Sequence, residues 1–210
     1  MLTQAQLSGD AYDCYKDQPL CTTQLVVGQS GFAEMPTAAH LPLKQGGTYI
    51  LQIHYDNRFG LDLSDEKPGI RVWVEPPSEK AVSLPGKLHF FRAHPDSIVI
   101  PPDPEQKEFE IQTLISSEAT IAVLSETGAQ AFSSLVHMHE TGIRATVKLI
   151  RDGVHIRNVY ESNGFDFALQ TSKIDLWRLM PGDALVISCF YKPDPKRHIK
   201  GGWSSDDESK

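Results

Sequence analysis

Two runs of alternating apolar and polar residues follow each other in the middle of the chain. The first covers residues 143–151, the second covers residues 154–160, and the dipeptide Asp152-Gly153 separates them. Alternation with a period of two is typical of β-strands that bury one face. Asp-Gly between two such runs is a common hairpin turn. The sequence therefore predicts an antiparallel strand pair, and the buried face of its first strand consists of Ile143, Ala145, Val147 and Leu149.

Short runs of the same kind recur along the chain, punctuated by 14 prolines and 15 glycines. This pattern favours an all-β sandwich or barrel. Residues 75–80 are charged and contain Pro76 and Pro77, which cannot continue a strand ladder, so they form the best linker candidate. We therefore predict two β-domains, residues 1–77 and 78–210. The further predicted strands cover residues 48–56, 70–74, 87–91, 97–100, 108–115, 119–124, 130–139 and 184–191.

The composition narrows the classes of partner. A net charge of -7 without any basic run argues against nucleic acid and anionic membrane surfaces. No uninterrupted apolar stretch approaches the length of a membrane span, and no signal-peptide pattern is visible in the first residues. With 40% hydrophobic residues among 210, the chain can bury a core.

His137 and His139 lie one residue apart within the predicted strand 130–139. On a strand, residues i and i+2 point to the same side, whereas on a helix they would diverge by about 200°. Two imidazoles on one face offer two nitrogen donors to one metal ion. The alternative is a pair of half-exposed histidines on a sheet face. A further histidine, His54, lies on the more polar face of the predicted strand 48–56.

The chain contains three cysteines, Cys14, Cys21 and Cys189, and no Cys-x-x-Cys motif. An odd number leaves at least one thiol unmatched within the chain. Either these are thiols of a cytosolic protein, or their partners lie outside this sequence in a secreted one. The cysteines alone do not decide between these two readings.

Five segments in sequence order resemble the copper type II, ascorbate-dependent monooxygenases, and their dopamine β-hydroxylase-like branch in particular. They read LQIHYDN, VHMHETG, VKLIRDG, PGDALVISCFY and GGWSSDDE. The resemblance implies two antiparallel jelly-roll sandwich domains, the first one incomplete, with one copper on each in the intact family. It implies that His137, His139 and a methionine thioether hold the copper of the second domain, and that a His-His pair and His54 hold the other.

The activity implied by this resemblance is hydroxylation of a C–H bond with dioxygen, with ascorbate as the reductant. The substrate would be a small-molecule amine or a peptide, in the lumen of the secretory pathway or outside the cell. A non-catalytic jelly-roll binding module that has lost its copper ligands is the alternative. A cupin-type metal enzyme is a weaker third possibility. Cupins need a glutamate several residues after the His-x-His pair, whereas Glu140 directly follows it and would face away from a metal ion.

The sequence also departs from the family pattern. It contains no His-His pair, and the segment GGWSSDDESK has Ser209 and Lys210 where methionine and cysteine are expected. The resemblance pairs Cys189 with a cysteine after the methionine ligand, and pairs Cys14 and Cys21 with cysteines upstream. A partial chain that lacks both ends would account for all three. We expect such a chain to bind at most one copper, weakly, through His137 and His139.

Overall fold

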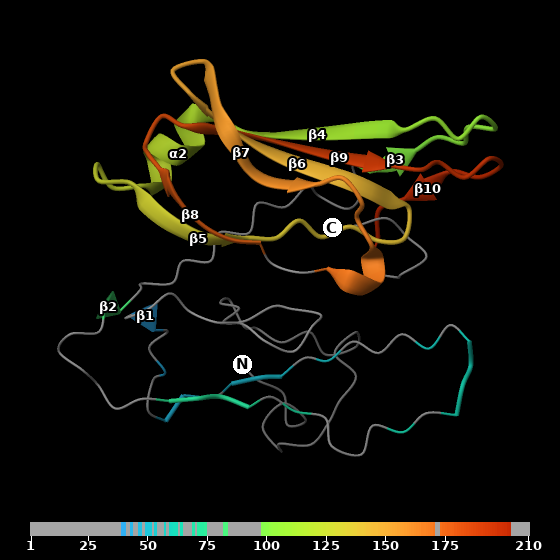
Figure 1. Ribbon diagram of the computed structural model, residues 1–210, viewed down its shortest axis with the longest axis horizontal. Coiled ribbons are helices and arrows are strands. Elements are labelled where there is room, and N and C mark those ends of the chain that lie inside the picture. The colour runs from blue at the N-terminus through green and yellow to red at the C-terminus, as the bar shows by residue number, and fades with distance from the viewer. Residues whose placement is uncertain are drawn as a thin grey trace. The chain divides into compact units, whose positions relative to one another are not determined.

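The computed structural model divides the chain into two compact units (Figure 1). The first comprises residues 1–27 and 33–89, and the second comprises residues 28–32 and 90–210. The residues that the structure describes are 39–40, 43, 46–47, 49–51, 53, 57, 59–62, 64, 69, 71–74, 82–83, 98–170 and 173–202. The domain boundary near residues 77 and 78 stays a prediction.

In the first unit, strand β1 (Ala39–His40) pairs in parallel with β2 (Val82–Ser83). The strands predicted at 48–56 and 70–74 are wrong for the positions that the structure describes, since 49–51, 53 and 71–74 form no strand. Alternation alone does not make a strand, because a ladder partner and a buried face are also needed. The apolar residues here, Leu51, Ile53, Val72 and Val74, are exposed. His54 lies outside the described residues.

A four-stranded antiparallel sheet forms the centre of the second unit, with strand order β4-β9-β6-β7. Its strands are β4 (Phe109–Ile115), β6 (Gly142–Arg151), β7 (Val154–Ser162) and β9 (Ala184–Tyr191). These strands confirm the predictions at 108–115, 143–151, 154–160 and 184–191. The β6–β7 turn has φ 51° at Asp152 and 75° at Gly153, as a type I′ hairpin requires.

A two-stranded ribbon crosses one face of this sheet (Figure 1). It pairs β5 (Ala129–Ser134) with β8 (Lys173–Leu179), and β8 was not expected from the sequence. A second small pair joins β3 (Val99–Ile100) to β10 (Ile199–Lys200). One hydrophobic core lies between these layers. It consists of Ile98, Ile100, Ile115, Met138, Ala145, Val147, Leu149, Val159, Tyr160, Leu179, Leu185, Tyr191 and Ile199.

The strand predicted at 119–124 is wrong, because these residues belong mainly to helix α2 (Ser117–Val123). The Ser116 hydroxyl caps the helix by accepting a hydrogen bond from the Ala119 N–H at 3.3 Å. Glu118 in the first turn adds a favourable charge near the amino end. Local capping therefore overrides the weak strand pattern.

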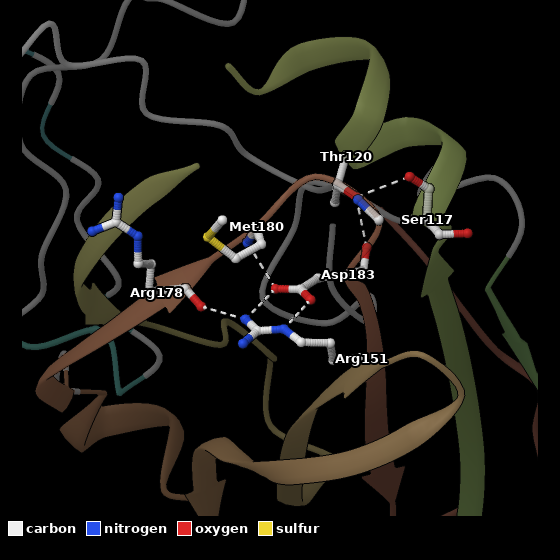
Figure 2. A network of polar contacts seen from close by, with 7 residues as sticks. Ser117, Thr120, Arg151, Arg178, Met180 and Asp183 are labelled. Carbon is white, nitrogen blue, oxygen red and sulfur yellow. Dashed lines mark hydrogen bonds and ion pairs between the residues drawn. The ribbon is translucent and has the colours of Figure 1, made fainter. Parts of the chain in front are cut away.

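A buried polar network joins α2, β6 and the turn before β9 (Figure 2). The Asp183 carboxylate, 1% exposed, accepts hydrogen bonds from Arg151 Nε at 2.7 Å, Arg151 Nη2 at 2.8 Å and the Met180 N–H at 2.7 Å. The Thr120 hydroxyl donates to the Asp183 carbonyl oxygen at 2.7 Å and accepts from the Gly182 N–H at 3.1 Å. This network holds the Pro181-Gly182-Asp183 turn against the helix.

The all-β class predicted from the sequence is confirmed, since antiparallel sheets dominate residues 98–202 and α2 is the one α-helix described there. The jelly-roll topology implied by the resemblance stays a prediction. Among the described helices, none is long and apolar enough to cross a membrane.

Candidate metal centre

The segment between β5 and β6 carries both histidines of the His-x-His motif. Strand β5 ends at Ser134, so the strand predicted at 130–139 is wrong from residue 135 onward. The Gly142 N–H donates to the His139 carbonyl oxygen at 3.1 Å, which closes a turn that leads into β6. Adjacent residues of this turn can then point into the core together. Met138 is fully buried and His139 is 6% exposed, whereas His137 is exposed.

A close packing contact determines how this turn sits on the core. A Cβ atom added at Gly142 would lie 2.7 Å from the Met138 Cβ and 3.0 Å from its sulfur. Only glycine therefore allows the Met138 side chain to pack this tightly against the start of β6. Since Met138 separates the two histidines, its burial also fixes the backbone from which both rings extend.

The turn brings the two imidazole rings together even though the segment is not a strand. Their centroids are 5.0 Å apart and the ring planes meet at 81°. Two imidazoles that bind one metal ion at about 2.0 Å from each nitrogen have centroids on the order of 5 Å apart. The centroid separation of the pair therefore matches that of two imidazoles on one ion, and imidazole is a ligand type that suits copper.

A short 3-10 helix, η2 (Phe167–Leu169), lies later in the chain and contacts the histidine pair. Asp166 caps it by accepting from the Ala168 N–H at 2.8 Å. The Phe167 ring meets the His139 ring edge to face, with centroids 5.7 Å apart. The Phe165 N–H donates to the Ile143 carbonyl oxygen at 2.8 Å, which ties the segment before η2 to β6.

The residue after η2, Gln170, is 6% exposed and contacts His137 directly. Its Oε1 lies 2.7 Å from His137 Nδ1. Its Nε2 donates to the carbonyl oxygens of Met138 at 3.1 Å and Phe167 at 3.0 Å. A single buried amide therefore bridges the histidine turn and η2.

Sequence reasoning identified His137 and His139 but missed Gln170 and Phe167. Gln170 lies 33 residues from His137 along the chain, and no periodicity or motif marks it. The other predicted ligand, His54, lies outside the residues that the structure describes. Within residues 98–170 and 173–202, no group of three or more His, Cys, Asp or Glu side chains is placed to hold a metal ion. Among the described residues, the candidate centre therefore consists of the histidine pair together with Gln170 and Phe167, which contact it.

A sequence model of the copper type II ascorbate-dependent monooxygenase C-terminal domain matches residues 86–209, which is more than half of the chain. The chain belongs to this family. The resemblance drawn from the five motifs is thereby confirmed, and the matched range includes the histidine pair, Gln170 and β4 to β10.

Three relatives show how this monooxygenase family member compares with longer proteins. It is 24% identical over 201 residues to MOXD1 homolog 1 of Drosophila melanogaster, covering 92% of this chain and 28% of that protein. It is 26% identical over 170 residues to dopamine beta-hydroxylase of Canis lupus familiaris, covering 76% of this chain and 25% of the relative. It is 28% identical over 187 residues to tyramine beta-hydroxylase of Caenorhabditis briggsae, covering 82% of this chain and 30% of that protein. The chain thus spans less than a third of each.

Proposed function

We propose that His137 and His139 bind one copper ion, and that the chain is the part of an ascorbate-dependent monooxygenase that carries this site. The observation that carries the proposal is that the two ring centroids lie 5.0 Å apart, within the residues that the family model matches. Neutral imidazole nitrogen is a ligand that both Cu(I) and Cu(II) accept.

The two histidines contribute differently because their surroundings differ. His139 is buried and its ring packs against Phe167, so its position is set by the core. His137 is exposed, so its ring provides the side of the centre that dioxygen and substrate can approach from solvent. A catalytic metal site keeps a coordination position open for a reactant, and an ion held by these two imidazoles would retain such positions.

Copper held there would support insertion of one atom of dioxygen into a substrate C–H bond, while the other atom leaves as water with two protons and with two electrons supplied by ascorbate. A small-molecule amine is the substrate class that we favour over a peptide, because related proteins are named for dopamine and tyramine. His54 is proposed as a ligand of the family's other copper. By the same relationship we place the protein in the secretory lumen or outside the cell, where its cysteines would form disulfide bonds.

A copper-free binding module is the second candidate. Ser209 favours it, because a serine hydroxyl stands where the resemblance leads us to expect the methionine thioether. Hydroxyl oxygen is a poor match for Cu(I), which prefers soft ligands.

Copper titration separates the two candidates. The full chain and its His137→Ala and His139→Ala variants would be titrated with Cu(I) and with Cu(II), and His155→Ala would serve as the control. His155 is an exposed histidine of β7 that bonds to Asn158 and lies outside the centre. We expect each variant of the pair to lose affinity and the control to retain it. Equal affinity in all four proteins would refute the copper site.

A further inference from the structure

We infer that Gln170 is a positioning residue of the metal centre, which holds the His137 imidazole in the tautomer that leaves Nε2 available as the metal ligand. This inference rests on the proposed function. We assign Gln170 no contact with metal or substrate, and its effect is exerted through its hydrogen bond to His137.

The orientation of the Gln170 amide follows from its partners. Its Nε2 lies 3.1 Å from the Met138 carbonyl oxygen and 3.0 Å from the Phe167 carbonyl oxygen. Carbonyl oxygens only accept hydrogen bonds, so the NH₂ group must face them. A flipped amide would bring its oxygen against two other oxygens in a site where Gln170 is 6% exposed. The amide oxygen therefore faces His137.

The protonation of His137 follows in turn. The Gln170 Oε1 carries no hydrogen, so the contact of 2.7 Å is a hydrogen bond only if His137 Nδ1 donates. A neutral imidazole has a single N–H, and with Nδ1 protonated the lone pair lies on Nε2. Metal-binding histidines commonly donate their second ring nitrogen to such an acceptor, which orients the ring and raises its basicity.

Exposure makes this support matter more for His137 than for His139. Core packing already holds the buried ring of His139, whereas the exposed ring of His137 has solvent on one side. Without the Gln170 acceptor at Nδ1, the Nε2-protonated tautomer of the neutral ring would gain population, which would lower the fraction of His137 that is competent to bind copper.

The tautomer can be measured without any metal. Long-range ¹⁵N–¹H spectra of the labelled, metal-free full chain at about pH 8, above the ordinary histidine pKa near 6.5, report which nitrogen is protonated. The His137 signals are assigned by their absence in His137→Ala. We expect protonated Nδ1 and a bare Nε2. A predominantly Nε2-protonated ring would overturn the inference.

Two substitutions separate the acceptor role of Gln170 from a purely structural role. Gln170→Glu keeps an acceptor for His137 but loses both donations to backbone carbonyls, whereas Gln170→Met loses all three bonds at similar length. We expect Gln170→Met to weaken copper binding by roughly 10- to 100-fold. Gln170→Glu brings a carboxylate oxygen against the Met138 and Phe167 carbonyl oxygens and should be less stable, but it should keep the Nδ1–H tautomer and lose less copper affinity than Gln170→Met. Equal losses in both variants would mean that Gln170 acts only as a structural donor, and would overturn the inference.

Gln130→Met is the matched control, because Gln130 Nε2 also donates to a backbone carbonyl, that of Trp177 at 2.9 Å, on the β5–β8 ribbon. We expect it to leave the His137 tautomer and copper affinity unchanged. Loss of copper binding in His137→Ala, with wild-type binding in Gln170→Met, would overturn the role of Gln170 and leave the proposed function standing. Unchanged copper binding in His137→Ala would instead overturn the proposed function, and with it the role of Gln170 at a metal.

Discussion

The Arg151–Asp183 pair gives a quantitative test of how the second unit is held together. The two side chains are unequally exposed, 38% for Arg151 and 1% for Asp183. Removing one partner of a buried ion pair destabilises a protein by roughly 3–5 kcal/mol, mainly because the other charge is left uncompensated. The size of the effect should therefore depend on which partner remains.

Asp183→Ala leaves behind a guanidinium that reaches water and still donates to the Arg178 carbonyl oxygen at 3.3 Å. We expect it to lower the free energy of unfolding by about 3 kcal/mol, at the lower end of that range. Arg151→Met leaves a buried carboxylate whose remaining partner is the Met180 N–H. We expect this variant to lose about 4–5 kcal/mol at neutral pH.

The effects of these substitutions also depend on pH. Burial raises the pKa of Asp183, but the hydrogen bonds from Arg151 and the Met180 N–H outweigh it, and the pKa lies below its ordinary value. The wild-type pair therefore contributes its full stability above about pH 5, and this contribution is lost as the pH falls through the lowered pKa. In Arg151→Met, burial would raise the pKa of Asp183, so protonation would relieve the buried charge, and the deficit against wild type should shrink in acid.

Urea unfolding of the full chain and both variants, followed by far-UV circular dichroism between about pH 4 and pH 8, measures these differences. Asp183→Asn, which keeps the side-chain shape, controls for the cavity left by alanine. An Arg151→Met variant that is more stable than Asp183→Ala at neutral pH, or whose deficit grows in acid, would refute this account of the pair.

The remaining predictions concern two glycines. Gly142→Ala should destabilise the second unit and weaken copper binding, because its Cβ would meet Met138 at 2.7 Å, and thermal unfolding with copper titration would check both. Unaltered copper affinity in that variant would show that the turn does not depend on this contact. Gly153→Ala should lower the free energy of unfolding by about 1 kcal/mol, since φ is 75° there and no atom lies within 4 Å of an added Cβ. Copper affinity should not change in Gly153→Ala, and a large loss would contradict its assignment to backbone strain alone.

Sequence reasoning succeeded where local pattern and tertiary environment agree. The alternation in residues 143–151 predicted the buried face of β6, where Ala145, Val147 and Leu149 are buried, and Asp152-Gly153 forms the expected turn. Strand β8 was missed although its inward side chains, Trp177 and Leu179, pack on the core. Its outward residues Ile174 and Leu176 are exposed and apolar, which removes the alternation in polarity that reveals a strand.

The candidate site was only partly predictable for a related reason. His137 and His139 were found because residues i and i+2 of a strand share one face, where two imidazoles can bind one ion. The expected geometry was wrong, however, because the rings meet through a turn anchored by Met138 and not through a strand. Gln170 and Phe167 reach the pair only through tertiary folding, so no local pattern could have pointed to them.

The claim that both rings bind the same copper ion is tested most directly by X-ray absorption spectroscopy at the copper edge. The full chain, His137→Ala and His139→Ala would each be loaded with less than one equivalent of Cu(I), so that the tightest site dominates the spectrum. We predict two imidazole ligands per copper in the wild type and fewer in either variant. A copper spectrum that is the same in all three proteins would contradict the shared site.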